Sequence, residues 1–414
     1  MEEQVLMFST PLAGFSHVVG SPELFVISRL FSGIGVGMGT TAQGVFLAEI
    51  SPVAYRGVIS SFGGFATNIG FIFASALGLP GAFGKKMSWP YAFYIESVPC
   101  IDVHEEEKSL KWNGERKGPV ESNLMDPNSE RNCGTNIKIL VVTNMAWFHD
   151  SPVFLLHSGN EAKSHQALVA YCRSDGARYE MQRVVDEVKS YKTNVDVVWD
   201  RAARRALKLS LTLNVIVSFS GILAVSFFGT SLLQSIGFTE RSASLANCLS
   251  GLSGTLGAVV STFAVDRIGR RALVLGSLLL LAAVNTLMMI LVYYFNTTKQ
   301  SWTGWAFLLL FIVFLFIFSA GIGPTAWFLG AELAPAGCRP RMQFMSVAAQ
   351  YVSCFLSPIV YYPLHSSVGA LSFFVFIIPL ILAAFYFYRY LPETKGRTTA
   401  EITAMLNENT SLSK

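Results

Sequence analysis

The sequence predicts an all-α protein, a polytopic bundle of transmembrane helices. Of its 414 residues, 52% are hydrophobic and only 14% are charged, whereas a soluble domain has roughly 25% charged residues. Apolar runs of about 20 residues, the length that crosses a bilayer core of ~30 Å, recur along the chain. One water-soluble core does not need so much apolar sequence, so the surplus is predicted to face lipid.

The predicted spans are densest in the C-terminal part of the chain. Six follow one another at about 206–229, 245–265, 272–295, 303–331, 342–364 and 368–390. Two more are expected at 24–47 and 58–79, and two partial segments at 5–20 and 89–101. The segment 5–20 is short and contains Pro11 and His17, and the segment 89–101 stops early.

Composition divides the chain into five parts. Residues 1–101 form a partial N-terminal transmembrane half, 206–391 a C-terminal half of six helices, and 392–414 a cytoplasmic tail. Residues 102–138 are polar and rich in charge, so they cannot lie in hydrocarbon and are expected to form a disordered insertion. Residues 139–205 contain the remnant of the helix that the insertion interrupts, followed by a cytoplasmic linker.

Charge in the loops predicts the orientation. Basic residues follow alternate spans, near Arg267, near Arg339 and near Lys395. Basic loops stay on the cytoplasmic side, so the C-terminus is predicted to be cytoplasmic in an integral, multi-pass protein of the plasma membrane. Asn296 begins a glycosylation acceptor, Asn-Thr-Thr, in a loop assigned to the outside.

A short motif occurs twice. The segment Ala48–Arg56 matches Ala331–Arg339 in an E-x-x-P-x-x-x-R pattern, at one offset because 332 − 49 and 339 − 56 both equal 283. Each copy follows a long apolar run at the predicted cytoplasmic face. The repeat predicts two halves related by pseudo-symmetry, a build that in many transporters places the substrate between the halves.

Several other classes of protein are not supported. The net charge of +4 is small and no basic stretch carries interleaved aromatics, so no nucleic-acid partner is expected. The six cysteines lack metal or disulfide spacing, and we find no metal-spaced histidines, nucleophile elbow or nucleotide loop. We therefore expect no enzyme, no metal and no cofactor. The expected partners are a small-molecule solute and the lipid bilayer, and the oligomeric state stays open.

Several motifs in order point to one family. They are Arg29-x-x-x-Gly33-x-Gly35, the repeated E-x-x-P-x-x-x-R, Asp150-Ser151-Pro152, Asp266-Arg267-x-Gly269-Arg270-Arg271 and Pro392–Thr398. From Arg29 to about Ile402 the chain resembles the sugar-porter branch of the major facilitator superfamily. The resemblance implies twelve helices in two halves and alternating access between them. Two departures from this pattern are expected: counterparts of the first two helices are missing with the third represented only by 5–20, and the sixth helix carries the insertion.

The resemblance implies a cytoplasmic gate of charged residues. Salt bridges and helix-end contacts there would hold the inner side closed and break as the halves move. The alternative is that these charges only set the topology. The predicted gate residues are Glu49, Arg56, Asp266, Arg270, Arg271, Glu332, Arg339 and Glu393.

The resemblance also implies a solute pocket, with fewer amides than hexose-binding relatives have. Amide side chains suit neutral hydroxyls, but the matching positions here are Gly64, Val217, Leu223 and Gly254. The predicted pocket residues are Ser218, Trp327, Gln350 and Tyr351. The expected solute is small and polar or amphipathic, a class that includes hexoses and related polyols, and negligible uptake of glucose is expected.

No acidic residue stands out within the spans as a proton site, which favours facilitated diffusion over proton coupling. Arg29 and Glu96 are the only candidates for a coupling residue. Two alternatives to transport remain: a non-transporting relative that acts as a sensor or regulator, and a defective truncated form.

Overall fold

The computed structural model describes most of the predicted spans. The described residues are 2–50, 56–79, 83, 87–95, 151–168, 181, 184–185, 201–224, 226, 233–234, 238–300, 302–335, 338–397 and 399–407. The predicted insertion, 102–138, lies outside them, as do Glu96 and Asp150. Within the described residues every element is helical, which confirms the predicted all-α class.

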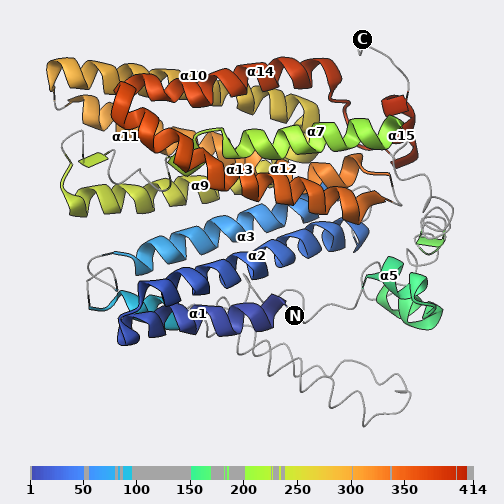
Figure 1. Cartoon of the computed structure of the whole chain (residues 1–414). Coiled ribbons are helices and arrows are strands. Elements are labelled where there is room, and N and C mark those ends of the chain that lie inside the picture. The colour runs from blue at the N-terminus through green and yellow to red at the C-terminus, as the bar shows by residue number, and fades with distance from the viewer. Residues whose placement is uncertain are drawn as a thin grey trace, which may run out of the picture. The chain divides into compact units, whose positions relative to one another are not determined.

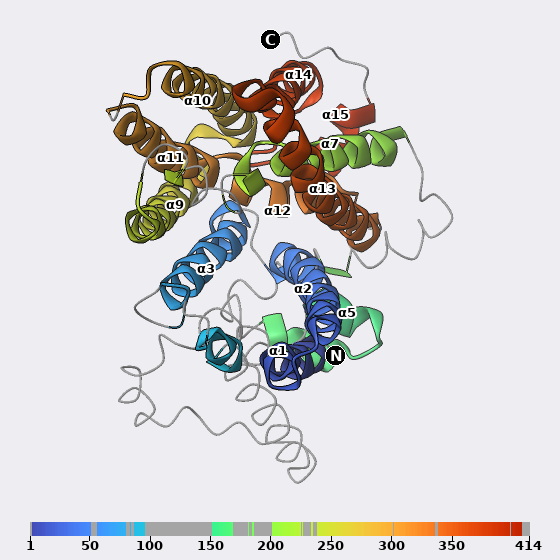
Figure 2. The ribbon, with the colours of Figure 1, turned by 60° about the vertical axis from the view of Figure 1, so that its left-hand side comes forward.

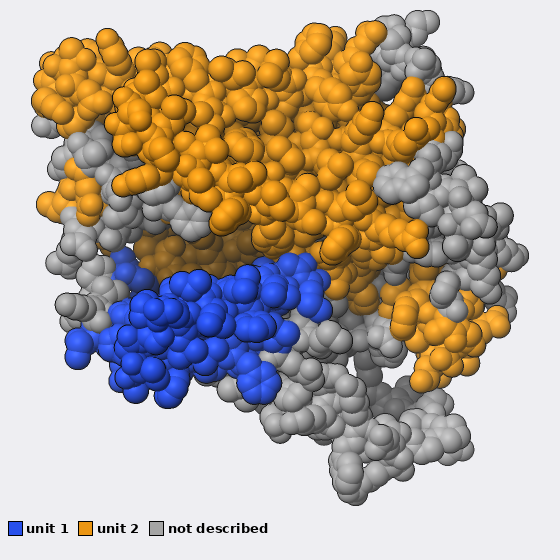
Figure 3. All heavy atoms as spheres, viewed as in Figure 1, with its two compact units in different colours: residues 1–39, 76–149 blue, residues 40–75, 150–414 orange. Residues whose placement is uncertain are grey.

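The chain divides into two compact units (Figure 3). Unit 1 is Met1–Gly39 with Ala76–His149, and it holds α1 (Glu2–Val19) and the first part of α2 (Pro22–Ile50). Unit 2 is Thr40–Ser75 with Asp150–Lys414, and it holds the rest of α2 and most of α3 (Arg56–Leu77). The C-terminal helices all belong to unit 2.

The described C-terminal helices form a bundle (Figure 1). They are α7 (Arg201–Ser218), α9 (Glu240–Ile268), α10 (Arg270–Thr298), α11 (Trp302–Ala320), α12 (Ile322–Leu333), α13 (Arg339–Val368), the 3₁₀ turn η4 (Gly369–Phe373) and α14 (Phe374–Tyr390). Two short helices flank the bundle in sequence, α5 (Pro152–His157) and α15 (Thr399–Asn407). In the bundle α9 packs against α11, α10 against α14, and α7 against α13 (Figure 2).

Length and composition agree with membrane spans. Six stretches of the described chain are long and apolar enough to cross a bilayer, at Pro22–Leu47, Arg201–Ala224, Cys248–Ile268, Arg270–Thr298, Trp302–Leu333 and Arg339–Tyr390. The last is 52 residues long, which is enough for two crossings of about 20 residues each. The predicted segments 5–20 and 58–79 are also helical, with shorter apolar parts at Val5–Val19 and Gly63–Leu77.

Helix α11 shows how one sequence serves two environments. Phe307, Phe311 and Phe314 recur at helical spacing and are fully buried in the bundle core. On other faces of the same helix Trp305 and Leu309 are 67% and 62% exposed. A helix that is apolar all round is stable here because one face packs in protein and the other is left for lipid.

The predicted span 303–331 contains a break at Gly321, which separates α11 from α12. A Cβ at Gly321 would collide with the Cβ of Ser277 on α10, so only glycine allows this approach. Pro324 follows in the first turn of α12, where its missing N–H leaves no helical bond unmade. Apolar periodicity does not reveal such a break.

The repeated motif has the same local structure in both copies. Helix α2 ends at Ile50 and α3 begins at Arg56, while α12 ends at Leu333 and α13 begins at Arg339. The glutamate is therefore the last residue but one of a helix, and the arginine opens the next helix. The helix boundaries are therefore separated by the same 283 residues as the two copies of the motif, since 333 − 50 and 339 − 56 both equal 283.

Candidate functional site

Charged residues gather where α9, α10 and α12 end or begin. Arg270 donates through Nη1 to Oδ1 of Asp266 at 2.9 Å and through Nη2 to Oε1 of Glu332 at 3.2 Å. The Arg270 and Glu332 side chains are only 5% and 6% exposed. The other carboxylate oxygen of Glu332 accepts from the hydroxyl of Thr394 at 3.0 Å. A buried pair with this many partners resists losing either member.

Glu393 caps the N-terminus of α10. Its carboxylate accepts from the backbone N–H groups of Arg270 and Arg271 at 2.9 and 3.1 Å. A negative charge is stabilised there by the unpaired N–H groups and the helix dipole. Gly269 makes the approach possible, because its φ is +95° and a Cβ would lie 2.7 Å from Oε2 of Glu393. Together these contacts tie the tail after α14 to the turn between α9 and α10.

Of the remaining predicted gate residues, some lie at the same helix ends and others have side chains outside the described part of the structure. The Arg339 side chain is buried and donates from Nε to the carbonyl of Ala331 at 3.1 Å. Arg271 donates to the carbonyl of Tyr388 at 2.7 Å. Glu49 lies in the last turn of α2, and Arg56 is the first residue of α3. The side chains of both residues are outside the described part of the structure. The gate role itself stays a prediction.

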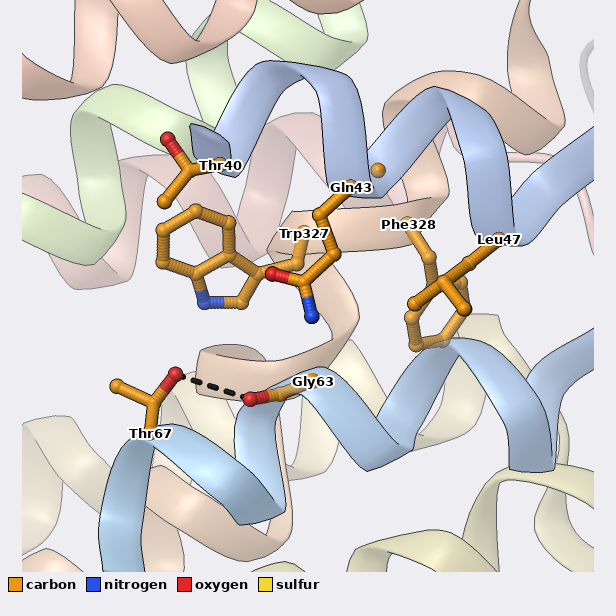
Figure 4. Close-up of a pocket in the computed structure, with 8 residues that line it drawn as sticks. Thr40, Gln43, Leu47, Gly63, Thr67, Trp327 and Phe328 are labelled. Atoms are coloured by element: carbon orange, nitrogen blue, oxygen red, sulfur yellow. Dashed lines mark hydrogen bonds between the residues drawn. The ribbon is translucent and has the colours of Figure 1, made fainter. Parts of the chain in front are cut away.

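A small cavity lies inside unit 2, between α2, α3 and α12 (Figure 4). Its volume is about 30 Å³, which is room for about two water molecules. Trp327 lies beside it, with its indole next to the Gln43 side chain. The cavity is lined by Thr40, Gln43, Gly44, Leu47, Gly63, Thr67, Trp327 and Phe328.

The polar groups of this cavity come from positions that the sequence analysis missed. Thr40 and Gln43 project from α2, and Thr67 projects from α3 and donates to the carbonyl of Gly63 at 2.9 Å (Figure 4). Their spacing contained a signal, since 40, 43, 44 and 47 share one helical face and 63 and 67 are one turn apart. Polar residues on one face of an apolar span indicate a site that is not turned to lipid.

Of the predicted pocket residues, Trp327 lines the cavity and Tyr351 is next to it. The Tyr351 hydroxyl lies 3.3 Å from the hydroxyl of Thr40. Ser218 and Gln350 lie instead in the packing between α7 and α13, where the Ser218 hydroxyl donates to the backbone carbonyl of Gln350 at 3.2 Å. Ser218 is fully buried, and Oε1 of Gln350 is buried without a hydrogen-bond partner in the structure.

The positions at which the family resemblance implies amides are tightly packed. At Gly64 an added Cβ would lie 3.1 Å from the ring of Pro324, and at Gly254 it would lie 2.8 Å from Oδ1 of Asn68. Val217 is 4% exposed within the bundle core. These positions therefore lack an amide, and a longer side chain at either glycine would have to displace a neighbour.

In unit 1 the side chain of Arg29 packs on aromatic rings. The guanidinium of Arg29 lies 4.7 Å from the ring centroid of Phe93 and 5.8 Å from that of Phe25. Its Nε and Nη2 atoms are buried and have no hydrogen-bond partner in the structure. Stacking on aromatic faces compensates only part of that burial.

Two other predicted features can be placed. Asn296 is exposed in the last turn of α10, which leaves its side chain accessible. Among the described residues no group of three or more His, Cys, Asp or Glu side chains is arranged to hold a metal ion.

Comparison with known families identifies this architecture. The model of the family "Sugar (and other) transporter" matches residues 4–103 and 135–406, which is most of the chain. The chain belongs to the sugar transporter family. It is a membrane transporter of the sugar-porter type, an integral multi-pass protein and not an enzyme. The predicted family and fold are confirmed, and the alternative of a non-transporting regulator is not favoured.

Individual relatives agree with this assignment. The chain is 25% identical over 401 residues to solute carrier family 2, facilitated glucose transporter member 3, of Canis lupus familiaris, covering 95% of this chain and 72% of that protein. It is 27% identical over 398 residues to the same transporter of Ovis aries, with the same coverage. Among solved structures, the proton:xylose symporter XylE bound to a bromodeoxyglucose matches with a TM-score of 0.72 at 19% identity, covering 98% of this chain and 83% of that one. That structure shares the major facilitator superfamily fold.

Proposed function

We propose that this transporter moves a neutral, polyhydroxylated solute through the cavity between α2, α3 and α12. The observation that carries the proposal is a cavity lined by an indole, a carboxamide and two threonine hydroxyls, with no charged side chain in its lining. Neutral donors and acceptors beside an apolar ring suit a sugar or polyol better than an ion. The similarity to a facilitated glucose transporter and to a xylose symporter supports the same class of solute.

Transport proceeds by alternating access in this proposal. The cavity of about 30 Å³ is too small for a sugar, so a solute enters only when the helices around it separate. α2 and α3 precede the polar linker and α12 follows it, so the cavity is shared by helices of both predicted halves. Motion of one half against the other would open it to one side of the membrane at a time.

The cluster around Arg270 is proposed as the cytoplasmic gate. Its contacts join α9, α10, α12 and the segment after α14 through buried or capped charges. The same basic loops support a cytoplasmic C-terminus, and the proposed location is the plasma membrane. Facilitated diffusion is proposed as the mode, since the cavity lining holds no acidic side chain that could carry a proton.

Flux in proteoliposomes tests the proposal. The purified chain is reconstituted and equilibrium exchange is measured for radiolabelled D-glucose, D-xylose and a linear polyol, with L-glucose as the leak control. Saturable exchange of at least one of the three above the L-glucose rate is expected, with glucose the weaker substrate if the closed amide positions matter. Exchange no faster than in empty liposomes for all three, by protein that is folded in size-exclusion chromatography, would contradict the proposal.

A further inference from the structure

Gln43 has a carboxamide that the protein does not use for its own structure. It reaches from α2 into the cavity (Figure 4) and makes no hydrogen bond within the part of the chain that the structure describes. A carboxamide has two N–H donors and an oxygen that accepts twice. Inside an apolar span such a group is costly unless something binds it.

Space for this carboxamide is provided by a glycine on the facing helix. A Cβ at Gly63 of α3 would lie 3.1 Å from Nε2 of Gln43, closer than side chains normally pack. The carboxamide therefore lies against bare backbone. One turn along α3 the Thr67 hydroxyl already donates to the carbonyl of Gly63, so it is left to accept from a ligand.

The arrangement matches a vicinal diol. A carboxamide can accept from one hydroxyl through its oxygen and donate to the neighbouring hydroxyl through its nitrogen. Thr67 supplies an acceptor beside it, and the Trp327 indole gives a flat apolar surface for the C–H face of a ring. Gly64 and Gly254 have no side chain and so supply no amide, and Pro324 and Asn68 lie against them.

We propose that Gln43 is the residue that selects the solute, by binding a vicinal diol of a neutral polyhydroxylated molecule against Trp327. This inference rests on the proposed function. It places the amide that selects the solute on helix α2, whereas the family resemblance implies amides at other positions. Gly63 is then a positioning residue that acts through Gln43.

The test pairs solute analogues with protein variants. Equilibrium exchange of D-glucose, D-xylose and singly deoxygenated glucoses is measured for the wild-type chain, Gln43→Leu and Gln43→Glu. Gln43→Leu is expected to raise KM about tenfold for the preferred sugar, which is the loss of roughly one hydrogen bond. One deoxy analogue that is poor for the wild type should lose nothing further in the variant, because its missing hydroxyl is the one that Gln43 binds. Gln43→Glu keeps the acceptor oxygens but loses the N–H donors, so its KM should lie between those of the wild type and Gln43→Leu.

A second pair of variants separates binding from folding. Gly63→Ala pushes the carboxamide by a few tenths of an ångström and should raise KM without lowering the amount of folded protein. The same change in a Gln43→Ala background should have no further effect, because the group it displaces is gone. Gln234→Leu makes the matched substitution at an exposed position and should leave KM unchanged.

The possible outcomes separate the inference from the proposed function. If the wild type exchanges a sugar and every Gln43 variant keeps its KM, the assignment of Gln43 is wrong and the function stands. If Gly63→Ala raises KM equally with and without Gln43, the glycine acts on its own and the pairing is wrong. A folded wild-type chain that exchanges none of the sugars would overturn both proposals together.

Discussion

The buried guanidinium of Arg270 is stabilised by two carboxylates. Asp266 and Glu332 bind its two terminal nitrogens, although its Nε is buried and has no hydrogen-bond partner among the described residues. Burying such a pair gains little overall, but removing one member leaves an uncompensated charge that costs about 3–5 kcal/mol. Such an ion pair suits a gate, because it is stable when both partners are in contact and unfavourable when one of them is left buried alone.

Glu332→Gln is expected to open the cytoplasmic end. It removes the charge that compensates Arg270, and the thiol of Cys338, 4% exposed at the start of α13, reports the change. Burial raises the pKa of Cys338, more than the nearby positive charge of Arg341 lowers it, so the closed form holds little thiolate. Maleimide labelling of Cys338 should be slow in the wild type and about tenfold faster in Glu332→Gln, faster still as the pH rises.

The matched control for this prediction is Glu161→Gln, which removes a carboxylate from an exposed site. Labelling is assigned to the right thiol by its loss in Cys338→Ser. Equal labelling rates for Glu332→Gln and Glu161→Gln would leave only the topological role for the charge of Glu332. Since the ion pair of Glu332 is with Arg270, a double-mutant cycle should be built on positions 270 and 332.

At the scale of elements, the turn between α9 and α10 positions the whole charged cluster. Gly269 ends α9 and caps α10 at a φ of +95°, where L side chains are strained. The turn brings two backbone N–H groups of α10 to the carboxylate of Glu393. The contact between Glu393 and α10 therefore depends on the geometry of one glycine, whereas Thr394 ties the same segment to Glu332 separately.

Gly269→Ala is expected to destabilise the protein by about 2 kcal/mol, from left-handed strain and the displaced helix cap. The control is Gly276→Ala on α10, where an added Cβ meets nothing within 4 Å and helix propensity should improve by about 0.5–1 kcal/mol. Thermal unfolding in detergent should lower the midpoint for the first variant and keep or raise it for the second. Equal midpoints would show that Glu393 does not depend on this turn.

The elements themselves were largely predictable from sequence, and their interruptions were not. Spans such as 272–295 correspond to α10 because runs of apolar residues have few other folds in lipid. The break at Gly321 depends on Ser277 of another helix, which no local pattern reveals. In the same way Trp327 was found by its motif, whereas Gln43 was missed because its role depends on the glycine facing it across the cavity.

At the scale of the molecule, orientation in the membrane decides which end of the bundle is the gate. The repeated helix ends at Ile50 and Leu333 lie on the same side if both halves are inserted as the loop charges predict. Asn296, exposed at the far end of α10 from Arg270, then faces outward. The orientation of the helices therefore decides that the Arg270 cluster is at the cytoplasmic face and Asn296 at the outer face.

Glycosylation tests the orientation directly. Expressed in a eukaryotic membrane, the chain should carry one glycan at Asn296, because acceptor sites are modified only outside the cytoplasm. Asn296→Gln should abolish the glycosidase-sensitive shift on a gel. Asn409→Gln provides the matched control in the C-terminal tail and should leave the shift unchanged. A shift that survives Asn296→Gln and vanishes with Asn409→Gln would reverse the predicted topology.

The last prediction concerns the energy source of transport. A proton-coupled carrier needs a group in its pathway that gains and loses a proton, and the lining of the cavity contains only neutral side chains. Arg29 is one candidate from the sequence, and the structure stacks its guanidinium on the rings of Phe25 and Phe93. Net flux should therefore stop when the solute concentrations are equal on both sides, and an imposed pH gradient should produce no accumulation.

The measurement is uptake into proteoliposomes with and without an acidic exterior, and with a protonophore as control. Accumulation that the protonophore abolishes would show coupling, and Glu96, the other candidate in the sequence, would then be the first residue to substitute.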